Sequence, residues 1–362
     1  MNEARGTALP GDHSEDIIAA LRQARAERRP VYISAGGSKR HWLGRHCEHA
    51  LLDISAHRGI VDYQPRELVL TARAATPLTE IEAALGEAQQ VLPFEPPLLG
   101  GRATLGGTLA CNLSGPARPW RGSVRDAILG VQLINGKCEH LSFGGRVMKN
   151  VAGYDVARLQ AGALGSLGVL TQISLKVLPR AEKTLTLRYD MAAAAAIETM
   201  NRRAGAPKPL SGACWYDGAL YLRLSGAATA VDSTAMQWGG EPLEESATPW
   251  HGLREMTLPY FDGAAPLWRF SIKPSAPLAT AAERTLIDWC GAQRWLRGAQ
   301  APAEMHRVAA AAGGHVIVFR GGDRHSEVRT PLGPVQQALQ QRLKRAFDPD
   351  GILNPGLLYS WL

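Results

Sequence analysis

One glycine-rich stretch, residues 99–115, constrains what this chain can fold into more than any other segment. It reads LGGRATLGGTLACNLSG and holds five glycines, three threonine or serine residues and no acidic side chain. Each glycine costs backbone entropy and packs no side chain, so ordinary helices and strands do not normally tolerate this density. Paired glycines also let backbone N–H groups converge on an anion. The stretch alone leaves two interpretations open, a tight turn or a cradle for a flat or phosphorylated ligand.

The composition is that of a globular protein large enough for two domains. The chain has 362 residues, of which 45% are hydrophobic and 20% charged. Its net charge is +7, but no basic tract interleaves with aromatic residues, so nucleic acid is not an expected partner. The usual zinc and iron–sulfur spacings are absent, and no metal site is predicted. The cysteines lie far apart, at Cys47, Cys111, Cys138, Cys214 and Cys290.

The chain is expected to be cytoplasmic. An odd number of unpatterned cysteines fits a reducing compartment. The first residues are polar and do not resemble a signal peptide. No apolar run approaches 18 residues, so membrane contact at the inner membrane is expected only through partners.

The first half of the chain combines short strands with glycine turns. A helix is predicted after Ser14, a strand over 31–33 and the turn SAGGSK over 34–39. Thr76 is expected to cap a second helix that begins at Pro77. The dinucleotide fingerprint G-x-G-x-x-G is absent. Asn135-Gly136 predicts a hairpin between strands over 128–134 and 138–143.

From residue 184 onward the pattern changes to antiparallel strands with helices. Strands are predicted over 185–189, 213–216, 219–224, 267–272, 285–289, 294–296 and 315–319, and helices over 191–203, 227–238 and 301–312. This arrangement indicates an antiparallel α+β layer. A helix over 335–347 and a proline- and glycine-rich turn over 348–356 complete the pattern.

Five blocks in order resemble the vanillyl-alcohol-oxidase/PCMH-type FAD-binding family. They are SAGGSK (34–39), TLGGTLACNLSG (104–115), RGSVRD (121–126), AGYDVARLQAGALGSLGVLT (152–171) and FDPDGILNPG (347–356). Finer details, FEPP (94–97), KNVAGYD (149–155) and IDWCGAQRWL (287–296), are similar to FAD-binding subunits of bacterial glycolate oxidases. Together the blocks span most of the chain.

The resemblance implies an α+β fold with two lobes around one FAD. Residues 1–180 would form the PCMH-type FAD-binding domain, with subdomains at about 1–55 and 56–180. Residues 181–333 would form a ferredoxin-like α+β cap on the substrate side. Residues 334–362 would return as a C-terminal helix and tail that pack on the FAD domain.

The resemblance also implies which residues border the cofactor. Those expected on the pyrophosphate are Ala35, Gly36, Gly37, Ser38 and Lys39. Those expected along the diphosphate and flavin edge are Thr104, Gly106, Gly107, Asn112, Ser114 and Gly115, with Gly122, Ser123 and Asp126 beside them. Gly153, Asp155, Gly168 and Val169 would pack on the adenine or isoalloxazine side. No histidine occurs between Ile33 and Lys39, so FAD is expected to be non-covalent.

Oxidation of a 2-hydroxy acid needs a hydride acceptor, a cation for the carboxylate, a base for the hydroxyl and an exit for electrons. The candidate carboxylate ligands are Arg307, Arg320 and Arg269, because a guanidinium binds a carboxylate in a bidentate manner. His306 and His315 are candidate bases. For each of these residues, surface pairing or core hydrogen bonding is the competing interpretation.

Three functional interpretations remain open at this point. In the first, the chain is the FAD subunit of a glycolate dehydrogenase, beside a catalytic FAD subunit and an iron–sulfur subunit. Catalytic relatives carry a metal-binding histidine pattern near G-D-G-N-x-H, and only Gly313-Gly-His315 and Gly321-Gly-Asp-Arg-His325 resemble it here. The second is a self-sufficient flavin-dependent oxidoreductase of the D-lactate type. The third is a non-catalytic assembly subunit.

Overall fold

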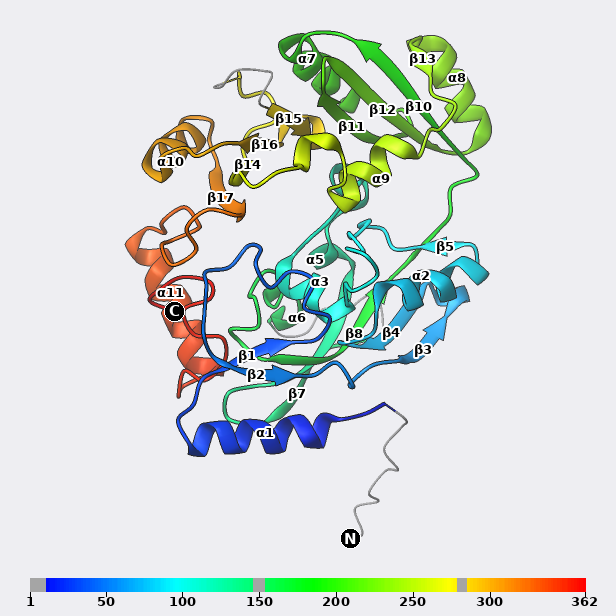
Figure 1. Ribbon diagram of the computed structural model, residues 1–362. Helices are drawn as coiled ribbons and strands as arrows, with labels where there is room; N and C mark the ends of the chain where they lie inside the picture. Colours follow the sequence, from blue (N-terminus) through cyan, green and yellow to red (C-terminus); the bar gives the residue numbers. More distant parts are fainter. Residues whose placement is uncertain (1–10, 146–153, 279–284) are drawn as a thin grey trace.

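Two antiparallel sheets, one of five strands and one of eight, organise the chain. The structure, a computed structural model, describes residues 11–145, 154–278 and 285–362. The five-stranded sheet has the order β3-β4-β8-β6-β7, and the eight-stranded sheet has the order β13-β10-β12-β11-β15-β16-β14-β17. We call the parts built on them the small-sheet lobe and the large-sheet lobe; they occupy the lower and upper halves of Figure 1.

The N-terminal helix covers a parallel pair of strands beside the small sheet. Helix α1 (Ser14–Ala26) buries Ile17, Leu21 and Ala24 at helical spacing. These side chains pack on β1 (Val31–Ser34) and β2 (Ala50–Asp53), which pair in parallel. The predicted helix is therefore confirmed, although His13 and not Ser14 is its N-cap residue.

The five-stranded sheet carries the core of the small-sheet lobe. Its strands are β3 (Ile60–Gln64), β4 (Val69–Arg73), β6 (Ile128–Ile134), β7 (His140–Gly144) and β8 (Val169–Lys176). Helix α2 (Leu78–Glu87) buries Ile81 and Leu85 against it. The predicted hairpin at Asn135-Gly136 is confirmed, because β6 and β7 pair in register from Ile134 and His140. The remaining elements here are η1 (Pro65–Glu67), β5 (Gln90–Val91), α4 (Arg118–Arg121), α5 (Val124–Ala127), α6 (Val156–Leu159) and β9 (Leu178–Pro179).

Two local expectations in this lobe are wrong. The stretch 99–115 contains a helix, α3 (Leu105–Cys111), whose N-cap residue Thr104 accepts a hydrogen bond from the Gly107 amide. Gly106 lies inside that helix. A Cβ on it would stand 2.7 Å from the Ala74 Cβ, so close packing against Ala74 explains why this helical residue is a glycine. Thr76 does not cap α2: its hydroxyl donates to the Gly59 carbonyl and accepts from the Gly59 amide.

The large-sheet lobe is the predicted antiparallel layer. Its strands are β10 (Lys183–Asp190), β11 (Leu210–Tyr216), β12 (Ala219–Gly226), β13 (Glu241–Pro242), β14 (Leu267–Ser271), β15 (Thr285–Asp288), β16 (Gln293–Arg297) and β17 (His315–Arg320). Its helices are α7 (Ala193–Ala204), α8 (Ala228–Trp238), α9 (Thr248–Glu255) and α10 (Pro302–Ala311), with η2 (Pro259–Phe261) and η4 (Trp289–Gly291). The sequence did not predict α9, although its Trp250 and Leu253 are buried.

The two faces of the large sheet have different neighbours. Helix α7 packs Ile197 and Met200 on one face, with Leu222 of β12 beneath them. The other face packs on α9 and on side chains of the small-sheet lobe, among them Leu43 and Leu113. This second face therefore forms the boundary between the lobes.

The C-terminal segment returns to the small-sheet lobe, where Figure 1 shows α11 (Pro334–Phe347) and the chain end at its side. The buried Lys344 ammonium donates to Asp348 Oδ2 at 2.7 Å and to the carbonyls of Ser166 and Leu353. The Asn354 side chain accepts from the Ile33 amide and donates to the Leu164 carbonyl. In the part of the chain that the structure describes, no helix is long and apolar enough to cross a membrane.

The Lys344–Asp348 pair predicts a large and local stability effect. Replacing Asp348→Ala leaves a buried ammonium without its carboxylate, which costs about 3–5 kcal/mol. The matched control is Asp350→Ala, which removes a half-exposed carboxylate paired with Arg25 and costs at most about 1 kcal/mol. Urea unfolding of the FAD-free protein measures both variants, and equal losses would contradict a special role for the buried pair.

Candidate functional site

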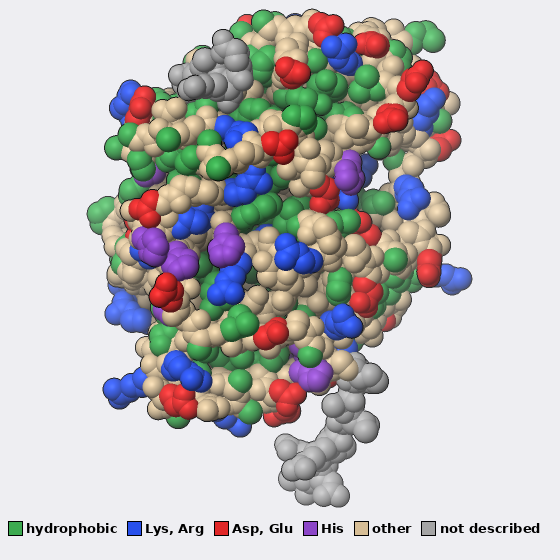
Figure 2. Space-filling view, in the orientation of Figure 1, with side chains coloured by type: hydrophobic (Ala, Val, Ile, Leu, Met, Phe, Trp, Pro, Cys, Tyr) green, Lys and Arg blue, Asp and Glu red, His purple; other side chains and the backbone are tan. Residues whose placement is uncertain are grey.

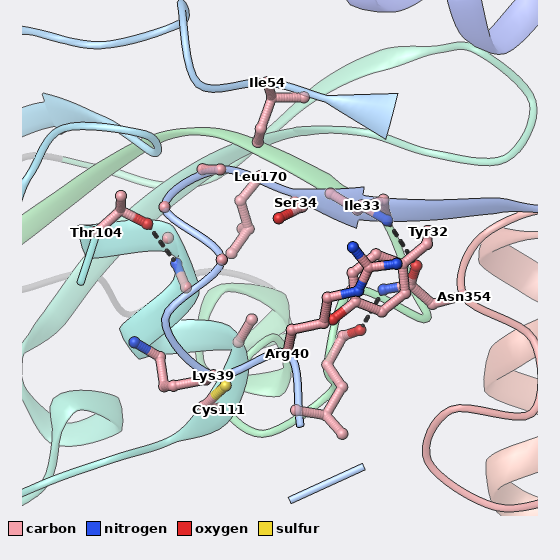
Figure 3. Close-up of a pocket in the computed structure, with 18 of the residues that line it drawn as sticks. Tyr32, Ile33, Ser34, Lys39, Arg40, Ile54, Thr104, Cys111, Leu170 and Asn354 are labelled. Atoms are coloured by element: carbon pink, nitrogen blue, oxygen red, sulfur yellow. Dashed lines mark hydrogen bonds between the residues drawn. The ribbon is translucent and has the colours of Figure 1, made fainter. Parts of the chain in front are cut away.

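A hollow of about 830 Å³ lies between the turn after β1 and helix α3. The turn contributes residues 34–40, α3 contributes Gly107 and Cys111 among others, and the tail contributes Asn354 and Leu357. Figure 3 shows these segments around one space, with Lys39 and Cys111 side by side and Asn354 near Tyr32.

Lys39 is the electrostatic centre of this hollow. Its side chain is buried, and burial lowers the pKa of its ammonium. Its Nζ donates to Ser38 Oγ at 3.1 Å, and no carboxylate of the described residues lies within 4.0 Å of it. A buried cation without an acidic partner is costly unless an anion neutralises it. This geometry points to an anionic ligand beside Lys39.

Close backbone packing explains the glycines around Lys39. A Cβ on Gly36 would stand 1.8 Å from the Arg102 carbonyl oxygen, so the turn and the stretch 99–115 touch through their backbones. Gly37 has φ +61°, a left-handed conformation that favours glycine. A Cβ on Gly107 would lie 4.0 Å from Lys39 Nζ. The Gly107 position therefore faces the cation directly.

The structure brings together a subset of the residues that the sequence suggested for the cofactor. Those that line the hollow are Ala35, Gly36, Gly37, Ser38, Lys39, Thr104, Gly106, Gly107 and Gly168. Ser114 and Gly115 line a second cavity instead. Asn112, Gly122, Ser123, Asp126, Asp155 and Val169 line neither cavity, and Gly153 lies outside the described residues.

Several of these remaining residues have local structural partners. Asp126 Oδ2 accepts from the amide and hydroxyl of Ser123 at the start of α5. Asp155 caps α6 by accepting from the Arg158 amide, and Val169 is fully buried in the core. Asn112 ends α3 at φ 50°, and its buried Oδ1 has no partner among the described residues. Their suggested cofactor contacts stay predictions.

Sequence reasoning missed lining residues on both sides of the hollow. Tyr32 lies under the Arg40 guanidinium, which stands 5.2 Å from its ring centre. Trp42 and Cys111 are further along the same wall. Asn354 carried a usable signal, because it lies in the N-P-G block and a buried asparagine needs several partners.

The second cavity, of about 420 Å³, lies between the lobes and shares Trp42 with the hollow. The sheet register builds it: Arg269 of β14 pairs with Trp295 of β16, and Gln293 two residues earlier pairs with Asp288 of β15. Since side chains alternate along a strand, all four point to the same face. Asp288 could have been noticed in the sequence, because it is an acidic residue at the end of an otherwise uncharged strand, β15.

The charges of this cavity are perturbed by burial. Burial, together with Arg329 and Arg118, lowers the pKa of Arg269 to about 10, so it stays charged at neutral pH. Its Nε is buried and has no hydrogen-bond partner among the described residues. Burial raises the pKa of Asp288 to about 8, although its oxygens accept from the Trp289 amide and the Gln293 side chain.

The suggested catalytic residues are spread over the large-sheet lobe. His306 and Arg307 lie on α10 and line neither cavity. Arg320 donates to the Phe261 carbonyl and stands 5.8 Å from the Trp42 ring centre. His315 begins β17, also outside both linings. Arg269 alone among these five lines a cavity described here.

Two family models match separate parts of the chain. Residues 6–144 match the model described as "FAD binding domain". Residues 285–358 match the model described as "FAD linked oxidases, C-terminal domain". A solved structure of alkyldihydroxyacetonephosphate synthase superimposes with a TM-score of 0.65 at 14% identity, covering 96% of this chain and 76% of that one. This likeness supports the fold alone.

Curated relatives give a finer comparison. The chain is 45% identical over 351 residues to "Glycolate oxidase subunit GlcE" of Escherichia coli (strain K12), covering 97% of this chain and 99% of that protein. It is 35% identical over 194 residues to "Glycolate oxidase subunit GlcD" of Bacillus subtilis (strain 168), covering 52% of this chain and 41% of that one.

The chain therefore belongs to the PCMH-type family of FAD-linked oxidoreductases, and FAD is its cofactor. Within that family it is similar over nearly its whole length to the glycolate oxidase subunit GlcE. The residues around the hollow fit this cofactor. A buried, unpaired Lys39 suits a diphosphate, and the apolar side chains of Ile33 and Leu170 suit a flat ring.

The position of Gly107 predicts a selective loss of FAD. In Gly107→Asp, a carboxylate placed beside Lys39 would neutralise the cation and repel a diphosphate, so we expect FAD occupancy to fall at least about tenfold. Gly107→Asn is the control of matched size without charge. The ratio of flavin to protein absorbance measures the FAD occupancy of both variants. Equal occupancy in the two would contradict an electrostatic role for Lys39 in FAD binding.

Proposed function

We propose that this chain is the FAD-binding subunit of a glycolate dehydrogenase complex that oxidises glycolate to glyoxylate. The observation that supports it most directly is the 45% identity with GlcE over 97% of the chain. The hollow with its unpaired Lys39 supplies the matching physical feature, a site for a dianionic cofactor.

Within that function the residues of the chain have distinct tasks. FAD, when bound, supplies a redox centre that can take up electrons and pass them on beside the catalytic FAD subunit. Lys39 would neutralise the diphosphate, and Gly36 and Gly107 would admit its close approach. Asn354 would hold the wall by tying Ile33 to Leu164. The large-sheet lobe would exclude water over the cofactor.

The proposal includes two further subunits, a catalytic FAD subunit and an iron–sulfur subunit. The chain is similar to GlcD, and that name denotes a second subunit of a glycolate oxidase. This similarity supports a partner subunit that is itself a flavoprotein. Two electrons taken from a hydroxy acid need an exit, and an iron–sulfur protein is the class that passes them on singly. In the Gly321–His325 fragment, Asp323 accepts hydrogen bonds from the His325 amide and from the hydroxyl of the next residue, Ser326, and the His325 ring lies 4.9 Å from that of His46.

A self-sufficient 2-hydroxy-acid oxidoreductase is the second candidate function. The cavity between the lobes favours it, because this cavity holds an unpaired Arg269 and an acid of its own. A D-lactate dehydrogenase of Archaeoglobus fulgidus is 24% identical over 168 residues, covering 46% of this chain and 38% of that protein. For either function we infer a cytoplasmic chain, with contact at the inner membrane through partners.

Purification of the chain alone and with its two proposed partners tests the proposal. We expect a visible flavin spectrum in the isolated chain, and glycolate turnover with a dye acceptor only in the assembled complex. Full turnover by the isolated chain would favour the self-sufficient enzyme. An assembled, flavin-loaded complex that leaves glycolate unchanged would overturn the proposed substrate.

A further inference from the structure

We propose that the outer face of helix α11 is the docking site for the iron–sulfur subunit of the complex, which would receive the helix in an apolar groove bordered by carboxylates. The identity of the partner rests on the proposed function; the docking face itself rests on the pattern of burial along the helix. Figure 1 shows α11 at the side of the small-sheet lobe, below β17.

The first argument is that the polarity of α11 is inverted. A surface helix normally turns its apolar stripe toward the core and its polar side chains toward water. Lys344 is the buried side chain of α11, and the half-buried Gln337 and Gln341 lie on the same side of the helix. Val335 and Leu339 lie on the opposite side, where they are 74% and 53% exposed. The helix therefore turns its polar side inward and leaves its apolar side uncovered.

The second argument is the continuity of the uncovered stripe. Its exposed members recur at the spacing of one helix face, and they are Val335, Ala338, Leu339, Arg342 and Ala346. This is the anchor pattern with which an amphipathic helix enters a groove of another protein. The 14 residues of α11 span about 21 Å, enough for three turns of contact. Single exposed apolar residues need no explanation, but a continuous stripe marks an interaction surface.

The third argument is the charge on this face. Arg342 lies within the stripe and Arg345 lies beside it; both are exposed, and neither forms a salt bridge with a described residue. The sequence of α11 contains no acidic residue. A complementary partner must therefore be acidic around its groove. An iron–sulfur cluster held by four cysteine thiolates is itself anionic, so the charge of such a subunit suits this face.

The position of α11 favours a partner that carries electrons. The buried Lys344 of the helix donates to the carbonyl of Leu353, and the next residue, Asn354, lines the cofactor hollow together with Leu357. A protein held on α11 is therefore attached to the same tail that forms one wall of the hollow. A subunit that exchanges electrons with the cofactor needs a docking place on such an element.

Two other occupants fit this face less well. If two copies of the chain paired through α11 about a two-fold axis, each would present the same Arg342 and Arg345, and like charges would meet. A membrane surface is usually bound through aromatic as well as aliphatic side chains, and the stripe from Val335 to Ala346 contains no aromatic residue. An acidic protein groove satisfies both the apolar and the cationic residues.

Calorimetric titration of the FAD-loaded full chain with the purified iron–sulfur subunit, under anaerobic conditions, tests the docking face. We expect Leu339→Gln and Arg342→Glu each to weaken association at least about tenfold, and Arg342→Lys to weaken it less because the charge remains. Leu51→Gln is the matched control, because Leu51 is 55% exposed on β2 and lies outside α11. Association should also weaken as salt is added.

The exposed positions of these variants separate docking from folding. We expect the flavin-to-protein ratio and the unfolding midpoint of each variant to match those of the wild-type chain. Absence of association between the wild-type proteins, or wild-type affinity in both Leu339→Gln and Arg342→Glu, would overturn the docking face.

The chain alone reveals the two other occupants. Sedimentation would detect a dimer that Leu339→Gln dissociates, and flotation would detect binding to phosphatidylglycerol vesicles that the same variant abolishes. Either result would overturn the iron–sulfur subunit as the occupant.

Activity of the assembled complex distinguishes this inference from the proposed function. Glycolate turnover by a complex that assembles normally from the Leu339→Gln variant would overturn the docking face and leave the proposed function standing. Assembly that depends on Leu339, in a complex that leaves glycolate unchanged, would support the docking face and overturn the proposed substrate.

Discussion

The two lobes are joined through polar groups at the ends of one short backbone stretch. At its start, the carboxylate of Glu255 on α9 accepts from the amides of Leu98 and Leu99. At its end, the Trp289 indole donates to the Gly115 carbonyl at 3.0 Å. Both cavities are built against the segment held between these two points, so their geometry depends on this attachment.

An ion pair between a buried arginine and a partly buried glutamate strengthens the same junction. Glu95 accepts from the Ala117 amide on its own lobe and pairs with Arg223 of β12 at 2.9 Å. A Cβ on Gly115 would stand 2.2 Å from the Glu95 carbonyl oxygen, so the two backbones touch there. Hydrogen bonds between charged side chains and backbone fix direction as well as distance, so they add orientation to the apolar contacts at the boundary between the lobes.

Sequence reasoning succeeded where one local rule decided the structure. Apolar spacing located α1, and Asn135-Gly136 located the β6–β7 hairpin. It failed where a contact distant in the chain decided. Glycine is required at position 106 because Ala74 packs against it, and the Thr76 hydroxyl hydrogen-bonds to Gly59 instead of capping helix α2. Neither partner can be inferred from the residues beside these positions.

The candidate site shows the same division. The turn 34–39 and the first part of the stretch 99–115 were identifiable as ligand-binding segments because glycine and hydroxyl residues have few other uses at that density. Arg269 and Asp288 form one cavity only through the register of three strands, and that register depends on tertiary pairing. For this reason the sequence offered His306, Arg307 and Arg269 equally as candidate catalytic residues. In the structure, only Arg269 of these three lines the cavity between the lobes.

The tail that lines the hollow has a consequence for the biosynthesis of the protein. Asn354 and Leu357 form part of the wall, and the Asn354 side chain ties β1 to the backbone at Leu164. During translation, the segments around Gly36 and Gly107 emerge long before these tail residues. The nascent chain therefore cannot complete this wall of the hollow until residues 354–357 have left the ribosome.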